Sequence, residues 1–179
     1  GAFNALAAKM VADEGFEAVY VSGAGVTNAY LGVPDLGLIS LSELADNVAA
    51  MRDVVDIPIV SDADTGFGNA VNVTRTVRVL ERAGANGIQL EDQVFPKKCG
   101  HFAGKAVIPA DEATQKIRAA VDARKDEDFV IVARTDARSV LGFEAALERA
   151  HGFIEAGADV TFVEAPESIE EIEQIAKLP

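Results

Sequence analysis

The chain has 179 residues, and its 16 basic and 29 acidic side chains give a formal net charge of −13. Hydrophobic residues make up 49% of it, which suffices for a buried core and argues against disorder. The acidic balance argues against nucleic acid as a partner, because phosphates carry the same sign of charge. No apolar run approaches the roughly 18 residues of a membrane span. The single cysteine forms no intrachain disulfide and favours a reducing compartment, so we expect a cytoplasmic protein.

Short apolar runs alternate with amphipathic helix patterns along the chain. The runs are rich in Val and Ile and mostly continuous, which is typical of parallel strands covered on both faces. The expected elements, in chain order, are strand 18–21, helix 41–54, strand 57–61, helix 70–83, strand 87–90, helix 110–124, strand 129–133, helix 143–156, strand 160–163 and helix 169–177. This order predicts an α/β fold with right-handed crossover connections.

Three of these helices have residues at their starts that favour helix initiation. Ser40 and Glu43 have the spacing of a capping box before the 41–54 helix. Asn69 is a suitable N-cap for the 70–83 helix, and Pro109 fits a first-turn position of the helix that follows it.

A weak repeat occurs three times, and each copy has a glycine followed seven positions later by a polar residue after a strand. The glycines are Gly15, Gly84 and Gly157, and the polar residues are Ser22, Glu91 and Glu164. The other two strands end in the segments DAD at 62–64 and RTD at 134–136. Polar residues at the carboxyl end of every strand mark the active face of a (β/α)8 barrel. A doubly wound open sheet, the alternative fold, gathers its ligand groups at one switch point.

The number of strands falls short of a complete barrel. A (β/α)8 barrel needs eight strands and typically ~250 residues. The sequence shows five clear strands, and residues 1–4 fit the exit of an earlier one. We therefore interpret residues 1–179 as a single, partial (β/α)8 TIM-type barrel catalytic domain with five or six of the eight strands.

Two aspartates, Asp62 and Asp64, follow the second strand in the segment DADTGFG at 62–68. Residues i and i+2 of a strand point to the same side, so their carboxylates repel each other unless a cation lies between them. Mg²⁺ suits such a pair, because it binds one or two carboxylates and keeps water or substrate oxygens as its other ligands. Glu91 and Asp92 follow the neighbouring strand. The pattern predicts a Mg²⁺ site, and the alternative is a strand-end aspartate that caps the next helix.

The only cysteine lies in the segment KKCGH at 97–101, between the third strand and the 110–124 helix. Nearby positive charge favours a thiolate, so Lys97, Lys98 and His101 would suit Cys99 for an acid/base or nucleophilic role. The alternative is a small buried hydrophobic residue, which is the usual state of a lone cysteine. A structural zinc site is not expected, because the sequence has no second Cys/His pair. His151 lies in a helix pattern and is expected to be structural.

Arg134 and the segment SGAG at 22–25 are candidate anion-binding groups. An arginine at a strand exit can bind a carboxylate through two parallel hydrogen bonds, and the alternative for Arg134 is an ion pair with Asp136. Ser22 and the small residues after it can offer backbone N–H groups to an anion. Tyr20 and Glu164 are weaker candidates for the same site.

Taken together, these motifs resemble the isocitrate lyase/phosphoenolpyruvate mutase superfamily from residue 1 to about residue 166. The most specific element is KKCGH, the signature loop of its carbon–carbon lyases. The segments DADTGFG, LEDQ at 90–93 and ARTDA at 133–137 also occur in family order. The phosphonomutase branch lacks the Cys-Gly-His loop, so the resemblance implies the branch of short-chain carbon–carbon lyases.

The resemblance implies a role for each candidate residue. Asp62 and Asp64 would hold Mg²⁺ (or Mn²⁺), directly or through water, with Glu91 and Asp35 around them. The substrate-binding residues would be Tyr20, Ser22, Gly23, Ala24, Cys99, Gly100, Arg134 and Glu164. The catalytic residues would be Cys99, Arg134 and His101.

The implied reaction cleaves a carbon–carbon bond in a methylisocitrate-like 2-hydroxy di- or tricarboxylate. A base removes the 2-hydroxyl proton, the bond breaks to leave a 2-oxo acid, and Cys99 protonates the carbanion of the other fragment. Mg²⁺ and Arg134 would stabilise the developing charge. Two further readings stay open, an oxaloacetate decarboxylase or carbon–carbon hydrolase on the same scaffold and an inactive truncated barrel. The expected partner is a small carboxylate rather than a membrane, and the full-length protein is expected to form a homo-oligomer.

Overall fold

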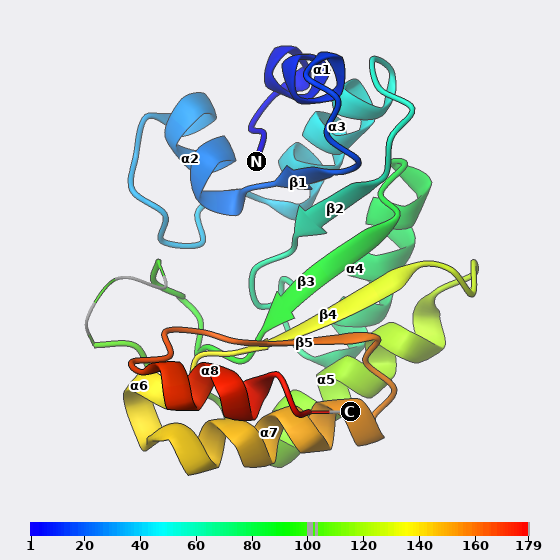
Figure 1. The fold of residues 1–179 in the computed structure, drawn as a ribbon. Coiled ribbons are helices and arrows are strands. Elements are labelled where there is room, and N and C mark those ends of the chain that lie inside the picture. The colour runs from blue at the N-terminus through cyan, green and yellow to red at the C-terminus, as the bar shows by residue number, and fades with distance from the viewer. Residues whose placement is uncertain (100–101, 103, 179) are drawn as a thin grey trace.

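The computed structural model describes residues 1–99, 102 and 104–178 and contains a five-stranded parallel sheet (Figure 1). The strands are β1 (Val19–Val21), β2 (Ile59–Asp62), β3 (Gly87–Glu91), β4 (Val130–Thr135) and β5 (Val160–Val163). Each strand pairs with the next one along the chain. This sequential order is that of a βα barrel, whereas a doubly wound sheet reverses its strand order at a switch point. The predicted fold class is confirmed.

The strand register brings the polar strand ends to one level. Asp62, the last residue of β2, lies opposite Gln89, and Glu91, the last residue of β3, lies opposite Arg134. Because all five strands run parallel, their carboxyl ends meet at the same edge of the sheet. The polar residues expected to form one active face are therefore close neighbours.

Helices connect the strands and follow the last of them. Among the described residues they are α1 (Ala5–Asp13), α2 (Gly23–Leu31), α3 (Leu41–Arg52), α4 (Ala70–Arg82), α5 (Ala110–Ala123), α6 (Arg138–Leu141), α7 (Phe143–Glu155) and α8 (Ile169–Ile175). Five of them match the helix patterns of the sequence and end one or two residues earlier than expected. Within the part of the chain that the structure describes, no helix has both the length and the apolar character of a membrane span.

Capping hydrogen bonds explain where α3 and α4 begin. The Ser40 hydroxyl accepts the Glu43 N–H at 3.3 Å, and the Glu43 carboxylate accepts the Ser40 N–H at 2.8 Å. Asn69 forms the equivalent box with Asn72 at the start of α4. Pro109 occupies the N-cap of α5 rather than a position in its first turn, one residue away from its expected place.

The sequence patterns do not indicate α1, α2 and α6. Helix α2 starts directly after Ser22, whose hydroxyl accepts the N–H of Gly25 at 3.1 Å. Two glycines in its first turn lower the helix propensity of the segment, which is why SGAG resembles a loop in the sequence. The segment is instead a capped helix N-terminus.

A short segment before α1 lies beside β1. Ala2 forms a parallel bridge with Val21. Its N–H donates to the Tyr20 carbonyl at 2.8 Å, and its own carbonyl accepts the Ser22 N–H at 3.1 Å. This pairing agrees with the interpretation of residues 1–4 as the exit of an earlier strand.

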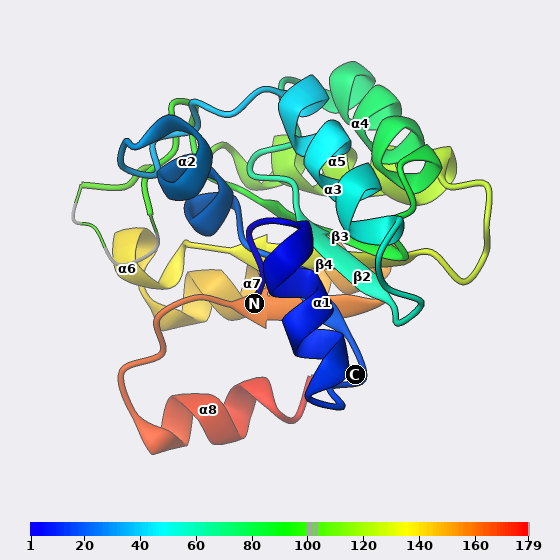
Figure 2. The same ribbon diagram turned by 90° about the horizontal axis from the view of Figure 1, so that it is seen from above.

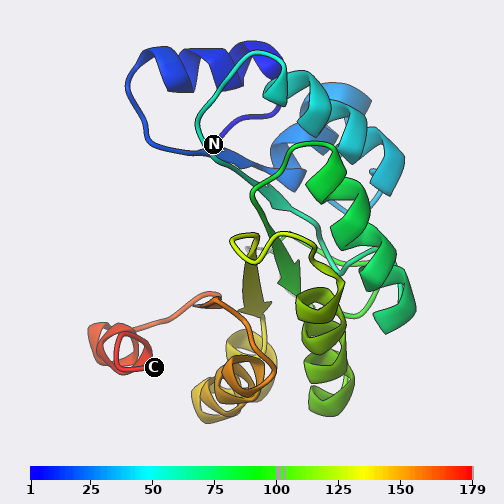
Figure 3. The same ribbon diagram turned by 90° about the vertical axis from the view of Figure 1, so that its right-hand side faces the viewer.

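The two faces of the sheet differ in what covers them. Side chains such as Val21, Ile88 and Ile131 are fully buried in the core, and Figure 3 shows α3, α4, α5 and α7 on one side of the sheet, with α8 set apart from them. On the edge strand β5, Val160 and Phe162 are 47% and 42% exposed. The face opposite the main helices therefore stays open to solvent.

The segments that follow the strands gather at one end of the sheet. Helix α2 follows β1, residues 92–99 and 104–109 follow β3, and α6 follows β4. Figure 2 shows these three segments on the same side of the molecule. They form the surroundings of the polar strand ends.

Candidate active site

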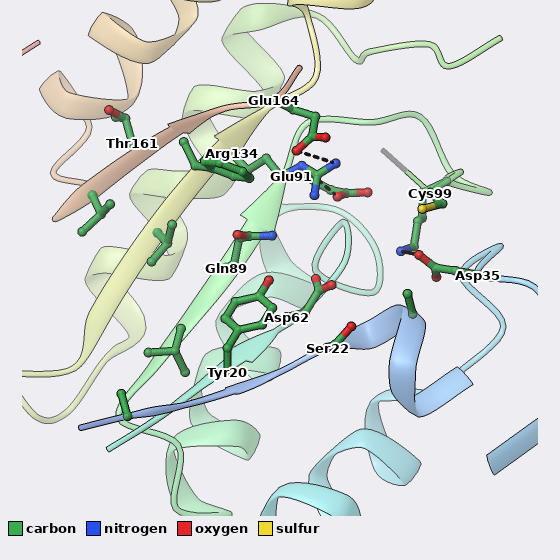
Figure 4. Close-up of a pocket in the computed structure, with 17 residues that line it drawn as sticks. Tyr20, Ser22, Asp35, Asp62, Gln89, Glu91, Cys99, Arg134, Thr161 and Glu164 are labelled. Carbon is green, nitrogen blue, oxygen red and sulfur yellow. Dashed lines mark hydrogen bonds and ion pairs between the residues drawn. The ribbon is translucent and has the colours of Figure 1, made fainter. Parts of the chain in front are cut away.

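A cavity of about 610 Å³ lies on the open face of the sheet, a size typical of small-molecule sites. Figure 4 shows polar side chains from several strands pointing into it. Those that come from the strands and their ends are Tyr20, Asp62, Gln89, Glu91, Arg134 and Glu164. Its apolar wall includes Ala18, Val60, Val132 and Val160. The predicted gathering of strand-end residues is thus present in the fold.

Lys97 lines this cavity and forms two short ion pairs there. Its ammonium group lies 2.7 Å from Asp35 Oδ2 and 2.7 Å from Asp64 Oδ1, and only 3% of the side chain is exposed. Burial opposes the charge, but the carboxylates of Asp64 and Asp62 outweigh it and raise the pKa of Lys97. The lysine expected to act on the cysteine two positions away instead stabilises carboxylates.

Asp62 and Asp64 approach each other by a different geometry from the one expected. Strand β2 ends at Asp62, and Asp64 has a left-handed φ of 47°, so the two are not alternate residues of one strand. Asp62 Oδ1 accepts the N–H of Asp64 at 3.0 Å, and Asp62 Oδ2 accepts the N–H of Gly23 at 3.3 Å. A methyl group on Gly23 would lie 2.9 Å from Asp62 Oδ2 and 3.2 Å from Asp64 Oδ1. Both carboxylates therefore meet at the N-terminus of α2.

The cluster of Asp35, Asp62, Asp64 and Glu91 has more negative charge than Lys97 neutralises. Burial, with Asp62 as the second cause, raises the pKa of Asp64 to about 6. Burial also raises the pKa of Glu91 well above its usual value. Asp35 Oδ1 and Glu91 Oε1 are buried without a hydrogen-bond partner. A further cation would relieve this imbalance.

The donor chemistry of this cluster fits a hard divalent cation such as Mg²⁺. All its candidate ligands are carboxylate oxygens, which Mg²⁺ prefers together with water. Among the residues that the structure describes, no group of three or more His, Cys, Asp or Glu side chains could hold a metal ion by itself. A cation bound by Asp62 and its neighbours would therefore complete its coordination with water or substrate oxygens.

The guanidinium of Arg134 is held among three carboxylates at the side of the cavity. Its Nε and one terminal nitrogen donate to Asp136 at 3.0 Å each, so the ion pair considered as the alternative for Arg134 is present. Glu91 and Glu164 each lie 3.5 Å away, and the Phe162 ring centroid lies 5.7 Å from the guanidinium carbon. Arg134 nevertheless lines the cavity. The ion pair fixes the guanidinium without withdrawing it from the site.

Cys99 lies on the cavity wall and is partly exposed. The backbone before it is held by Gln93, whose side-chain amide accepts the N–H of Lys98 at 3.0 Å and donates to its carbonyl at 2.9 Å. The Lys98 ammonium donates to the Gly104 carbonyl at 2.8 Å, so both lysines beside the cysteine are bound elsewhere. The predicted site residues Gly100 and His101 lie outside the described residues.

The predicted anion-binding segment after β1 is only partly available to a ligand. The N–H of Gly23 donates to Asp62, and the N–H of Gly25 donates to Ser22. Ser22 and Ala24 line the cavity. In place of an open loop of free N–H groups, the segment supplies a helix N-terminus that already stabilises a carboxylate of the cluster.

Tyr20 and Gln89 form the inner part of the cavity, and Figure 4 shows both side chains directed into it. Burial, followed by the charge of Asp62, raises the pKa of Tyr20, so the phenol stays protonated. Tyr20 is among the residues predicted from the sequence, whereas Gln89 is not. A signal for Gln89 was present, because it lies two residues before Glu91 on the same strand and so points to the same side.

A family model described as phosphoenolpyruvate phosphomutase matches residues 1–178. The chain is 56% identical over 177 residues to a 2-methylisocitrate lyase of Aeropyrum pernix, covering 99% of this chain and 56% of that protein. It is 50% identical over 175 residues to the 2,3-dimethylmalate lyase of Eubacterium barkeri, covering 98% and 61%. The chain spans about three fifths of the length of these relatives.

Solved structures of similar proteins share the fold. The crystal structure of 2,3-dimethylmalate lyase matches with a TM-score of 0.95 and 37% identity, covering 99% of this chain and 60% of that one. Oxaloacetate acetylhydrolase with the inhibitor 3,3-difluorooxalacetate matches with a TM-score of 0.94 and 39% identity, covering 98% and 61%. Phosphonopyruvate hydrolase with oxalate and Mg²⁺ matches with a TM-score of 0.87 and 38% identity, again covering 98% and 61%. With a family model that covers almost its whole length, the chain belongs to the phosphoenolpyruvate mutase/isocitrate lyase superfamily.

Proposed function

We propose that the chain carries the active face of a Mg²⁺-dependent carbon–carbon lyase. Its substrate is a 2-hydroxy di- or tricarboxylate of the methylisocitrate type, and its products are a 2-oxo acid and a second carboxylate. The observation that carries this proposal is one cavity lined by the carboxylates of Asp62 and Glu91, the guanidinium of Arg134 and the thiol of Cys99. The relatives named as lyases support it.

Asp62, Asp64 and Glu91 would hold the cation, directly or through water. When bound, Mg²⁺ polarises the substrate oxygens and stabilises negative charge that develops on them. The N–H of Gly23 and the ammonium of Lys97 hold the two aspartates in place. These contacts favour the charged carboxylates that a metal ligand requires.

Arg134 and Tyr20 orient the substrate around the bond that breaks. Arg134 binds a substrate carboxylate, and its position is fixed by Asp136 at 3.0 Å. Tyr20 keeps its proton and so donates a hydrogen bond rather than acting as a base. Both groups place hydrogen-bond donors where negative charge develops, which is the arrangement that stabilises such charge.

Cys99 supplies the proton that completes the cleavage. A base removes the 2-hydroxyl proton, and the oxygen electrons form the new C=O bond of the 2-oxo acid. The electron pair of the broken carbon–carbon bond remains on the other fragment as a carbanion stabilised by its carboxylate. The thiol of Cys99 donates its proton to that carbon, and the thiolate then takes up a proton for the next turnover.

A second candidate is cleavage of oxaloacetate on the same scaffold. The structural match to oxaloacetate acetylhydrolase, with a TM-score of 0.94, is the observation that favours it. Oxaloacetate has no 2-hydroxyl group. Its carbon–carbon bond would instead be cleaved by the addition of water or by the loss of CO₂. The same cluster and Arg134 would bind the substrate's carboxylates.

A substrate panel distinguishes the two. The protein is incubated with 2-methylisocitrate, 2,3-dimethylmalate or oxaloacetate, each with Mg²⁺ or with excess EDTA, and the products are separated by chromatography. A 2-oxo acid released from one of the first two substrates, with Mg²⁺ only, is the expected result. Turnover of oxaloacetate alone would favour the second candidate, and turnover that persists in EDTA would contradict the Mg²⁺ dependence.

A further inference from the structure

A second cluster of charged side chains begins at Asp92, directly after the candidate metal ligand Glu91, and extends to α7. Asp92 follows β3, Thr135 ends β4, and Arg149 lies on α7. Asp92 is 2% exposed and Arg149 is 8% exposed. None of the three lines the main cavity, and the proposed reaction does not use them.

Asp92 uses both of its carboxylate oxygens in this cluster. Its Oδ2 accepts the Thr135 hydroxyl at 2.7 Å and an Arg149 nitrogen at 3.0 Å. Its Oδ1 accepts the backbone N–H of Asp136 at 2.9 Å. Arg149 also donates to the Ile108 carbonyl at 2.8 Å, just before α5. The cluster therefore joins the ends of β3 and β4 to α5 and α7.

Asp136 connects this cluster to the cavity. Its backbone is held by Asp92, and its carboxylate accepts two hydrogen bonds from Arg134 at 3.0 Å and one from Lys105 at 2.8 Å. Burial opposes the charge of Asp136, but the hydrogen bonds from Arg134 and Lys105 outweigh it and lower its pKa. Lys105 lies on the same loop as Cys99. A shift of Asp136 would thus move both Arg134 and Lys105.

A buried ion pair is often replaceable by apolar residues without loss of stability, so burial alone does not explain why Asp92 and Arg149 are charged. The distinguishing feature is the third hydrogen bond of Asp92, to the backbone of the residue that holds Arg134. An apolar pair would fill the space of Asp92 and Arg149 but could not accept that N–H. Catalytic groups must be held to within about 0.5 Å, and such contacts supply that constraint.

We propose that Asp92 is a positioning residue for the substrate arginine. Fixed by Arg149 and Thr135, it holds the backbone of Asp136, which in turn sets the direction of the Arg134 guanidinium. The consequence of this chain of contacts for catalysis rests on the proposed function, in which Arg134 binds a substrate carboxylate. The geometric part, that Asp92 and Arg149 fix Arg134, does not depend on that function.

Two readouts on one set of variants test this. The first is solvent exchange of the Arg134 Nε–H, followed by NMR on protein labelled with ¹⁵N-arginine and assigned through Arg134→Lys. The second is the affinity for oxalate with Mg²⁺, measured by calorimetry. The variant is Arg149→Met. The matched control is Arg124→Met, because Arg124 also binds one carboxylate, on Asp159, and one backbone carbonyl.

Arg149→Met is expected to speed exchange of the Arg134 Nε–H by roughly tenfold, the effect of losing about one buried hydrogen bond. It should weaken oxalate binding by roughly 10- to 100-fold. Arg124→Met should leave both within about twofold even where it lowers the melting temperature. If Arg149→Met does not fold, Thr135→Val removes one contact to Asp92, together with the acceptor of the Ala137 N–H at 3.1 Å, and should shift both readouts in the same direction.

Unchanged Arg134 exchange in a folded Arg149→Met or Thr135→Val protein would overturn the proposal and leave the cluster a structural one. Faster exchange together with weaker oxalate binding supports it in full. Faster exchange in a protein that binds oxalate equally well, or whose wild type does not bind oxalate, supports the positioning of Arg134. That outcome would contradict the proposed role of Arg134 in binding a substrate carboxylate.

Discussion

Lys97 balances part of the charge of the site, and its position determines what the neighbouring carboxylates can do. It is almost fully buried between Asp35 and Asp64. One ammonium group cannot neutralise these two carboxylates together with Asp62 and Glu91, and Arg134, 3.5 Å from Glu91, already pairs with Asp136 at 3.0 Å. The remaining negative charge is the physical basis for expecting a divalent cation, and it also makes the cluster sensitive to pH.

In the absence of metal, the stability of Asp64→Asn relative to that of the wild type should increase as the pH rises. The pKa of Asp64 in the fold is about 6, above the ~3.9 of an unfolded aspartate. Between these two pKa values the native state binds the proton more tightly than the unfolded state does. The stability of the wild type therefore falls as the pH rises and is lowest above pH 6. In urea unfolding with EDTA, the stability of Asp64→Asn relative to wild type should increase by up to about 3 kcal/mol between pH 4 and pH 7.

The matched control for this measurement is Asp13→Asn, which removes an exposed carboxylate that pairs with Lys9 at 3.4 Å. Its stability relative to wild type should change little over the same range. A difference between Asp64→Asn and wild type that is independent of pH would show that Asp64 titrates as an ordinary surface aspartate.

Replacing Cys99 with Ser should remove most turnover and leave substrate binding largely in place. A serine hydroxyl holds its proton far more tightly than a thiol, so it cannot act as acid and base near neutral pH. Loss of such a group typically lowers the rate by ~10²–10⁴. The measurement is kcat together with the calorimetric Kd for the substrate that the wild-type protein cleaves. A Cys99→Ser protein with near-normal kcat would make the cysteine a packing residue and favour cleavage that does not use it.

The sequence predicts which strand-end residues meet, because neighbouring parallel strands bring their carboxyl ends together. Asp62, Glu91 and Arg134 are predicted to meet in this way, and all three line the cavity. The ion pair of Lys97 with Asp35 could not be predicted from the patterns, since Asp35 is 62 positions away in the sequence on a segment without periodicity. Alternation along a strand also fails at Asp64, where the left-handed backbone turns the chain out of the strand.

At the scale of elements, α2 links the fold most directly to the site. Its first turn brings the N–H of Gly23 to Asp62, and its positive end faces both carboxylates of the pair. Only a residue without a side chain leaves room there. Glycines lower the helix propensity of this segment, and the site requires the glycine at position 23.

Gly23→Ala should therefore weaken Mg²⁺ binding. The added methyl group would lie 2.9 Å from Asp62 Oδ2 and 3.2 Å from Asp64 Oδ1, which forces the carboxylates to move. Gly25→Ala is the control, because its methyl group would meet Phe3 at 3.1 Å and the Ser22 side chain at 3.3 Å rather than either aspartate. In a calorimetric Mg²⁺ titration we expect a roughly tenfold weaker affinity for Gly23→Ala only, the effect of about 1.4 kcal/mol. Equal affinities for both variants would contradict the role given to the helix start.

The segment after β3 is held by contacts that no sequence period predicts. Its hydrogen bonds between Gln93 and Lys98 set the backbone before Cys99. These contacts follow no helical or strand period, so the sequence could indicate the chemistry of the segment KKCGH but not where it lies. The structure places Cys99 on the cavity wall.

At the scale of the molecule, five βα units form a sheet whose one face is covered by helices and whose other face carries the cavity. The order of apolar runs and helix patterns predicted this architecture, because sequential parallel strands need a helix on each crossover. The residues along the open face, such as Val160 and Phe162, are apolar but exposed. Periodicity alone does not reveal what covers such a face in a chain that spans about three fifths of its relatives.

A calorimetric Mg²⁺ titration in the presence of oxalate tests most directly whether the acidic cluster is a Mg²⁺ site. Wild-type protein should bind about one Mg²⁺ per chain, because Asp62 and Glu91, which line the cavity, belong to one cluster of carboxylates. Asp62→Asn should weaken this binding at least about tenfold, a loss of ~1.4 kcal/mol, while Asp13→Asn should leave it unchanged. Absence of Mg²⁺ binding by the wild type, or equal binding by Asp62→Asn, would contradict the account.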